Sequence, residues 1–142
     1  MTSKYLIKNV QVSGVLSDIA IENETITAIG ASLKSDGATE FDFTGSVALP
    51  GLVDLHTHLR EPGKEDAETV LSGSMAAAKG GFVAISAMAN TSPVADTAGV
   101  VEQVYRLGQE AGLLDVFPIG AVTEGLKGES LSEIGAMADS VA

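Results

Sequence analysis

The sequence predicts an α/β protein in which a β-rich segment, residues 1–50, precedes a segment of alternating strands and helices, residues 51–142. Two observations predict this class. Residues 4–48 contain short runs of β-branched and aromatic residues, separated by turn residues. After Pro50 and Gly51, apolar runs of strand length alternate with stretches of helical periodicity. We therefore expect two domains that meet near these two residues.

The β-rich segment contains the runs YLIKNVQV, DIAIENETITAIG and TEFDFTGSVALPG. Their alternating and β-branched residues are typical of strands, and short turns connect them. Consecutive strands joined by short turns usually pair with opposite directions. We therefore expect an antiparallel sheet in residues 4–48.

The second segment is predicted to contain three strands, at residues 52–58, 82–88 and 113–123, and three helices, at 65–79, 96–112 and 130–142. Because each strand is followed by a helix, the sheet is expected to be parallel and its crossovers right-handed. The near-continuous apolar run LVDLHTH predicts that the first of these strands is buried. Small residues around Gly73 would let the first helix approach the sheet closely.

The helix ends carry their own signals. Asp66 is a suitable N-cap for the first helix and Gly80 a suitable residue just past its end, while Gly112 ends the second helix. Ser130 and Glu133 have the spacing of a capping box and predict the start of the third helix.

Three parallel strands would leave both edges of their sheet unpaired. The third predicted helix also runs to Ala142 without a capping residue or a stop signal. Both features predict a domain that is truncated relative to its fold.

The composition excludes several classes of protein. A net charge of −11 would repel a polyanion, which argues against a nucleic-acid partner. The absence of cysteine rules out disulfides and thiolate chemistry and fits a reducing cytoplasm. No apolar run approaches the ~20 residues of a membrane span, and the first residues lack the apolar core of a signal peptide. We expect a cytoplasmic protein that does not enter a membrane.

Both histidines of the chain, His56 and His58, lie in the stretch HTHLREPG, at the end of the apolar strand. Residues two apart on a strand face the same side, so the two imidazoles should project together. Such a pair can bind one zinc ion at Zn–N distances of ~2.0–2.1 Å. A His-X-His pair also occurs by chance, but ligands bind at the carboxyl ends of parallel strands, which is where this pair lies. The sequence therefore predicts two metal ligands.

Two further polar residues are expected beside this pair. Arg60 faces the same side as His58 if the strand continues, and its guanidinium could clamp a carboxylate; the alternative is a solvated charge. Asn90 follows the second strand in AMANTSP, and adjacent strand ends would place it near Arg60; the alternative is a turn residue. A cation beside a metal site favours an anionic ligand that the two share.

Two histidines do not complete a catalytic zinc site, which normally has three protein ligands. Glu124, after the third strand, is the one fair carboxylate candidate in this chain. Its surroundings, TEGLKGE, are interpreted more simply as a glycine-rich loop.

The stretch LPGLVDLHTHLREPG resembles the N-terminal signature of the amidohydrolase superfamily, and most closely that of the type I dihydroorotases. MANTSP is similar to that family's asparagine motif after the second strand, although Ala89 stands where the family often has proline, and GAVTEGLKGESLSE is similar to its segment after the third strand. The resemblance covers essentially all of the chain. It implies the first three βα units of a TIM-type (β/α)8 barrel in residues 51–142, preceded by part of a small β-sandwich in residues 1–50.

The resemblance also implies a function. His56 and His58 would bind Zn2+, as one or two ions, and Arg60 and Asn90 would hold the carboxylate of the substrate. The family reaction interconverts N-carbamoyl-L-aspartate and L-dihydroorotate in pyrimidine biosynthesis, with a metal-activated water attacking the ring amide. The family's other ligands and its catalytic acid would follow Ala142, so residues 1–142 alone are expected to be inactive. A homo-oligomer and a complex with aspartate transcarbamoylase are further implications.

Two alternatives stay open. An allantoinase- or hydantoinase-like cyclic amidase acts on a ring without that carboxylate, and is not expected to keep Arg60. A non-catalytic homologue could instead serve as a partner of aspartate transcarbamoylase. The intact HTHLREPG stretch argues against degeneracy at the first metal position.

Overall fold

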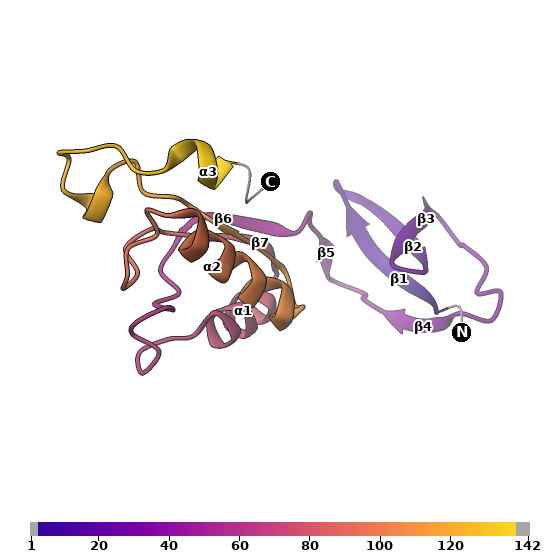
Figure 1. Cartoon of the computed structure of the whole chain (residues 1–142). Coiled ribbons are helices and arrows are strands. Elements are labelled where there is room, and N and C mark those ends of the chain that lie inside the picture. Colours follow the sequence, from indigo (N-terminus) through magenta and orange to yellow (C-terminus); the bar gives the residue numbers. More distant parts are fainter. Residues whose placement is uncertain (1–2, 139–142) are drawn as a thin grey trace. The chain divides into compact units, whose positions relative to one another are not determined.

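The computed structural model describes residues 3–138 and divides the chain into two compact units, Met1–Pro50 and Gly51–Ala142. Each unit has a β-sheet of its own, and the helices lie in the second unit (Figure 1). No helix within the described residues is both long and apolar enough to span a membrane.

The first unit is a mixed sheet with the order β3-β2-β1-β4, in which β5 also pairs with β1. Its strands are β1 (Lys4–Val12), β2 (Val15–Glu22), β3 (Thr25–Gly30), β4 (Thr39–Asp42) and β5 (Val47–Ala48). The predicted antiparallel pairing is found between β1, β2 and β3. It is wrong for β4 and β5, which run parallel to β1, because residues 31–38 carry the chain back before β4 begins.

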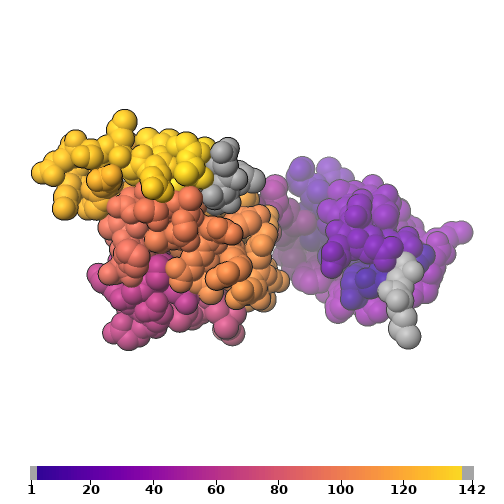
Figure 2. All heavy atoms as spheres, in the orientation of Figure 1, coloured from indigo at the N-terminus to yellow at the C-terminus, as the bar shows by residue number. Residues whose placement is uncertain are grey.

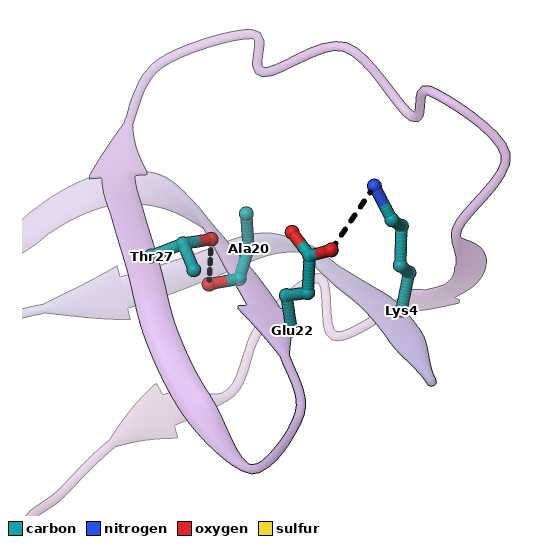
Figure 3. A network of polar contacts seen from close by, with 4 residues as sticks. All are labelled: Lys4, Ala20, Glu22 and Thr27. Carbon is teal, nitrogen blue, oxygen red and sulfur yellow. Dashed lines mark hydrogen bonds and ion pairs between the residues drawn. The ribbon is translucent and has the colours of Figure 1, made fainter. Parts of the chain in front are cut away.

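Side chains reinforce the antiparallel part of this sheet (Figure 3). Lys4 and Glu22 lie opposite each other on β1 and β2, and their charged groups are 3.3 Å apart. The hydroxyl of Thr27 on β3 donates to the carbonyl of Ala20 on β2. Since both charged groups are exposed to water, the ion pair contributes at most about 1 kcal/mol.

The second unit has the predicted alternation of strands and helices. A parallel sheet, with the order β6-β7-β8, is formed by β6 (Leu52–Thr57), β7 (Phe82–Ala87) and β8 (Asp115–Pro118). Helix α1 (Val70–Lys79) connects the first pair of strands and packs on β7, while α2 (Ala98–Ala111) connects the second pair and packs on β8. A short 3-10 turn, η1 (Glu124–Leu126), and α3 (Ile134–Ala138) follow.

Two apolar clusters form the core of this unit. One joins the strands to α1 and α2. The other joins α2 to the loops beyond the strand ends and to Met137 of α3. In Figure 2 the yellow atoms after β8 lie against the orange atoms of the α2 region, as this second cluster requires. Helix α2 therefore packs against the strands through one cluster and against the loops beyond them through the other.

Two helix starts differ from the sequence prediction. The N-cap of α1 is Thr69 and not Asp66, because Thr69 and Ser72 form a reciprocal capping box. Helix α3 begins at Ile134 and does not use Ser130 as its cap, because residue 131 pairs with Thr123 in an isolated bridge. Residues 139–142 of the predicted third helix lie outside the described residues.

The predicted burial of the first strand of this unit is not observed. Leu52, Val53 and Leu55 of β6 are 45%, 56% and 71% exposed. Within residues 3–138 this strand pairs with β7 on one side alone. By strand alternation Val53 and Leu55 lie on one face of β6, while Leu52 lies on the other face with Asp54 and His56, and the described residues cover little of these apolar side chains.

Candidate functional site

The two histidines lie together at the carboxyl end of β6. His56 is in the strand and His58 follows its last residue. Their ring centres are 5.2 Å apart and the rings meet edge to face, at 69°. Two imidazoles bound to one tetrahedral zinc at ~2.0–2.1 Å have ring centres roughly 5 Å apart, so the pair fits two positions of one metal ion.

The rest of a metal site is not formed by the described residues. Within residues 3–138 no group of three His, Cys, Asp or Glu side chains is close enough to hold a metal ion. Glu124, the carboxylate candidate from the sequence, is exposed in η1, and its backbone N–H donates to the carbonyl of Ser130. Glu124 is therefore better described as a residue of the glycine-rich loop TEGLKGE than as a metal ligand.

Asn90 lies against His58. The Oδ1 atom of Asn90 is 2.8 Å from Nδ1 of His58, and both side chains are exposed. Strand order predicts Asn90 at this strand end but nearer to Arg60. The contact with His58 depends on the path of the loop between Ala87, where β7 ends, and Asn90, and strand order alone does not predict that path.

Backbone hydrogen bonds join the segments that carry these two residues. The N–H of Met88 donates to the carbonyl of Thr57, directly before His58. The hydroxyl of Thr57 donates to the carbonyl of Ser86. Further along, the N–H of Ser92 donates to the carbonyl of Pro62. The loops after β6 and β7 are thus bonded to each other on both sides of the His58–Asn90 contact.

Arg60 departs from the expected geometry. Since β6 ends at Thr57 and Arg60 has a φ of 62°, the alternation of a strand does not extend to it. Its carbonyl accepts from the N–H of Lys64, which fixes a turn at this position. The side chain is half-buried, and within residues 3–138 it forms no hydrogen bond with His58 or Asn90. Arg60 therefore lies in the loop that follows the histidines, with its backbone constrained.

Two acidic residues that no sequence pattern predicted form hydrogen bonds within this loop and to α1. The carboxylate of Glu61 accepts from the N–H of Val70, the first residue of α1, at 2.7 Å. The carboxylate of Glu65 accepts from the N–H of Gly63 at 2.7 Å, and this hydrogen bond is the main cause that lowers the pKa of Glu65. Glu61 lies nine residues before Val70, so its bond to the helix start had no local sequence signal. The bond within the turn at Gly63 had no such signal either.

A cavity of about 220 Å³ lies between the end of β6 and α1. Asp54, Thr57 and His58 line it from the strand side, with Glu68 and Gly73 on the other side. Gly73 lets α1 approach Leu59 closely, because a Cβ there would lie 2.5 Å from the Leu59 side chain. This close approach is to a residue just past the end of β6 and not to a strand of the sheet.

The comparisons with known proteins agree with one another. A family model described as dihydro-orotase-like matches residues 45–142. A dihydroorotase of Streptomyces coelicolor is 59% identical over 141 residues, which is 99% of this chain and 33% of that protein. A dihydroorotase of Leifsonia xyli is 62% identical over 127 residues, which is 89% of this chain and 29% of that protein. The chain thus spans about a third of the length of these relatives.

Among solved structures, an L-hydantoinase (dihydropyrimidinase) from Arthrobacter aurescens is similar, with a TM-score of 0.77 and 24% sequence identity. The match covers 98% of this chain and 31% of that one, and at this identity it shows the fold alone. The family model covers more than half of the chain, and the Streptomyces relative matches nearly all of it. This chain belongs to the dihydro-orotase-like family.

Proposed function

We propose that residues 1–142 form the N-terminal third of a zinc-dependent dihydroorotase, which interconverts N-carbamoyl-L-aspartate and L-dihydroorotate in pyrimidine biosynthesis. The observation that carries this proposal is the pair His56 and His58 at a strand end, with ring centres 5.2 Å apart and Asn90 bonded to one of them. The names of the relatives support the same activity.

In this proposal the second unit supplies the first three βα units of a (β/α)8 barrel, and residues 1–50 supply part of a β-sandwich. The exposed apolar residues of β6 support it. A barrel strand has a neighbour on each side and is covered on both faces, so it is apolar all round. Leu52, Val53 and Leu55 are apolar and lack such cover in the described residues.

Each site residue has a defined task. His56 and His58 hold the metal ion, which when bound supplies a Lewis acid and lowers the pKa of water. Arg60 offers parallel N–H donors to the substrate carboxylate, and Asn90 offers its amide N–H to the same group. The remaining ligands and the catalytic acid are proposed to lie outside this chain, so the chain alone is proposed to be inactive.

The same proposal includes the location of the enzyme and the proteins with which it associates. We place it in the cytoplasm, as a homo-oligomer, with aspartate transcarbamoylase as a further partner. Light scattering on the whole protein, with and without purified aspartate transcarbamoylase, measures both associations. A monomer whose mass does not change on mixing would contradict this part.

A chimera tests the activity directly. Residues 1–142 replace the matching third of the Streptomyces coelicolor dihydroorotase, and turnover of L-dihydroorotate is measured with zinc. We expect turnover that the substitution His58→Ala abolishes, because that variant loses a metal ligand.

The other outcomes would overturn the proposal. A folded, zinc-loaded chimera that hydrolyses hydantoin and not dihydroorotate would identify the neutral-ring amidase. A folded, zinc-loaded chimera that turns over neither ring would identify the non-catalytic homologue. Circular dichroism and metal analysis of the chimera separate both results from a failure to fold.

A further inference from the structure

The contact between His58 and Asn90 defines which nitrogen of the imidazole carries its proton. The Oδ1 atom of Asn90 can only accept, so a hydrogen bond across the 2.8 Å between them is formed by the tautomer in which Nδ1 of His58 donates. In the neutral ring this leaves Nε2 without a proton. A bare Nε2 is the form that a metal ion needs.

The same contact orients the amide of Asn90. Its oxygen is turned toward the histidine, so its NH2 group is left for another partner. An NH2 group donates and cannot accept, so the partner that suits it is an oxygen with lone pairs, such as a carboxylate. One amide thus contacts His58 with its oxygen and keeps its nitrogen available to donate to an anion.

The backbone around Asn90 supports this orientation. The bonds Met88 to Thr57 and Ser92 to Pro62 hold the two loops together before and after the contact. Gly63 lies so close to Ser92 that a Cβ on Gly63 would be 2.0 Å from the Ser92 carbonyl oxygen. The side chains of His58 and Asn90 are exposed, but hydrogen bonds join the backbones of the two loops that carry them.

We propose that Asn90 is a positioning residue for the metal ligand His58, in addition to its role as a donor to the substrate carboxylate. It holds His58 in the Nδ1–H tautomer and thereby couples the metal position to the anion position through one side chain. This inference rests on the proposed function for the metal and the carboxylate. Two substitutions separate the tasks: Asn90→Asp keeps an acceptor for Nδ1 but repels an anion, and Asn90→Ala removes both interactions.

The first test needs no metal and no activity. The chain has only two histidines, so nitrogen NMR of histidine-labelled residues 1–142 shows two imidazoles, which His56→Gln assigns. At about pH 9, where ordinary imidazoles are neutral, we expect the Nδ1–H tautomer for His58. Asn90→Asp should keep it, and Asn90→Ala should shift the ring toward Nε2–H. Gln103→Ala, which removes an exposed amide from α2, should change nothing.

The second test measures zinc affinity in the chimera by competition with a chelator. Loss of an outer partner of a ligating histidine typically weakens metal binding 10–100-fold, and we expect that range for Asn90→Ala. Asn90→Asp should retain the affinity, while both variants raise KM for dihydroorotate. An unchanged tautomer and an unchanged zinc affinity in Asn90→Ala would overturn the positioning role. Because the NMR result does not depend on turnover, it stays interpretable if the proposed activity is wrong.

Discussion

At the scale of single residues, Gly63 shows how closely the two site loops approach each other. Its φ is 102°, which an L side chain rarely adopts, and a Cβ would lie 2.0 Å from a backbone oxygen of Ser92. A clash with backbone is costly because a main-chain atom cannot move aside as a flexible side chain can. The loops of His58 and Asn90 thus depend on a residue without a side chain.

We predict that Gly63→Ala destabilises the chain by more than the ~1–3 kcal/mol that an unusual backbone conformation costs alone. Gly81→Ala is the matched control, because Gly81 has a similar φ of 86° but no atom within 4 Å of its Cβ position. Urea unfolding of both variants measures the difference. Equal losses of stability would show that the approach to Ser92 carries no cost.

The site was only partly predictable at this scale. The two-residue period of a strand predicted that His56 and His58 project together, and their rings do lie together although His58 is one residue past the end of β6. The contact of Asn90 with His58 depends on a bond between two loops far apart in the sequence. The expected orientation of Arg60 failed because the strand ends before it, and local propensity does not define a strand end to within a residue or two.

At the scale of elements, the start of α1 depends on side chains that cap its free N–H groups. The hydroxyl of Thr69 accepts from the N–H of Ser72, and the hydroxyl of Ser72 accepts from the N–H of Thr69. Thr97, at the same position of α2, makes no side-chain capping bond. The two threonines differ in their interactions although their sequence context suggests the same role.

We predict that Thr69→Ala lowers the free energy of unfolding by ~1 kcal/mol, the usual value of an N-cap bond, while Thr97→Ala changes it by a few tenths at most. Thermal or urea unfolding of both variants measures these values. If Thr97→Ala costs as much as Thr69→Ala, the side-chain bond is not what stabilises the start of α1.

The docking of β4 onto β1 involves Asp42. Its carboxylate accepts from the side chain of Asn9 at 3.0 Å and from the hydroxyl and N–H of Thr44. These hydrogen bonds, with the one from Asn9 first, hold the pKa of Asp42 below its ordinary value of 3.8. A lowered pKa in the folded state means that the ionised carboxylate stabilises the fold above the unfolded-state pKa, and that this contribution is lost as the pH falls through the folded-state value.

We predict that the amide signal of Thr44, followed by NMR from neutral pH to about pH 2, titrates with a midpoint below 3.8. Asn9→Ala should raise this midpoint, since it removes the largest cause of the shift. Glu40→Gln, on the same strand, should leave it in place. A midpoint at or above 3.8 in the unsubstituted chain would contradict the role given to Asn9.

At the scale of the whole molecule, the sequence predicted the order of the helices and strands but not how deeply the strands are buried. Local periodicity in the sequence indicates the alternation of apolar strands and helices, and this alternation predicted the α/β class and the parallel sheet of the second unit. Burial depends on what packs against a strand. The apolar residues Leu52, Val53 and Leu55 predict a covered strand, but the described residues leave all three exposed.

The proposed recognition of a substrate carboxylate beside a metal ion is tested most directly by Arg60→Ala in the zinc-loaded chimera. Loss of a bidentate clamp should cost ~2 kcal/mol or more, which lowers kcat/KM for L-dihydroorotate at least about 30-fold. Turnover of a ring without the carboxylate should not fall in parallel. An unchanged kcat/KM for dihydroorotate in a folded variant with full zinc content would contradict this proposed recognition.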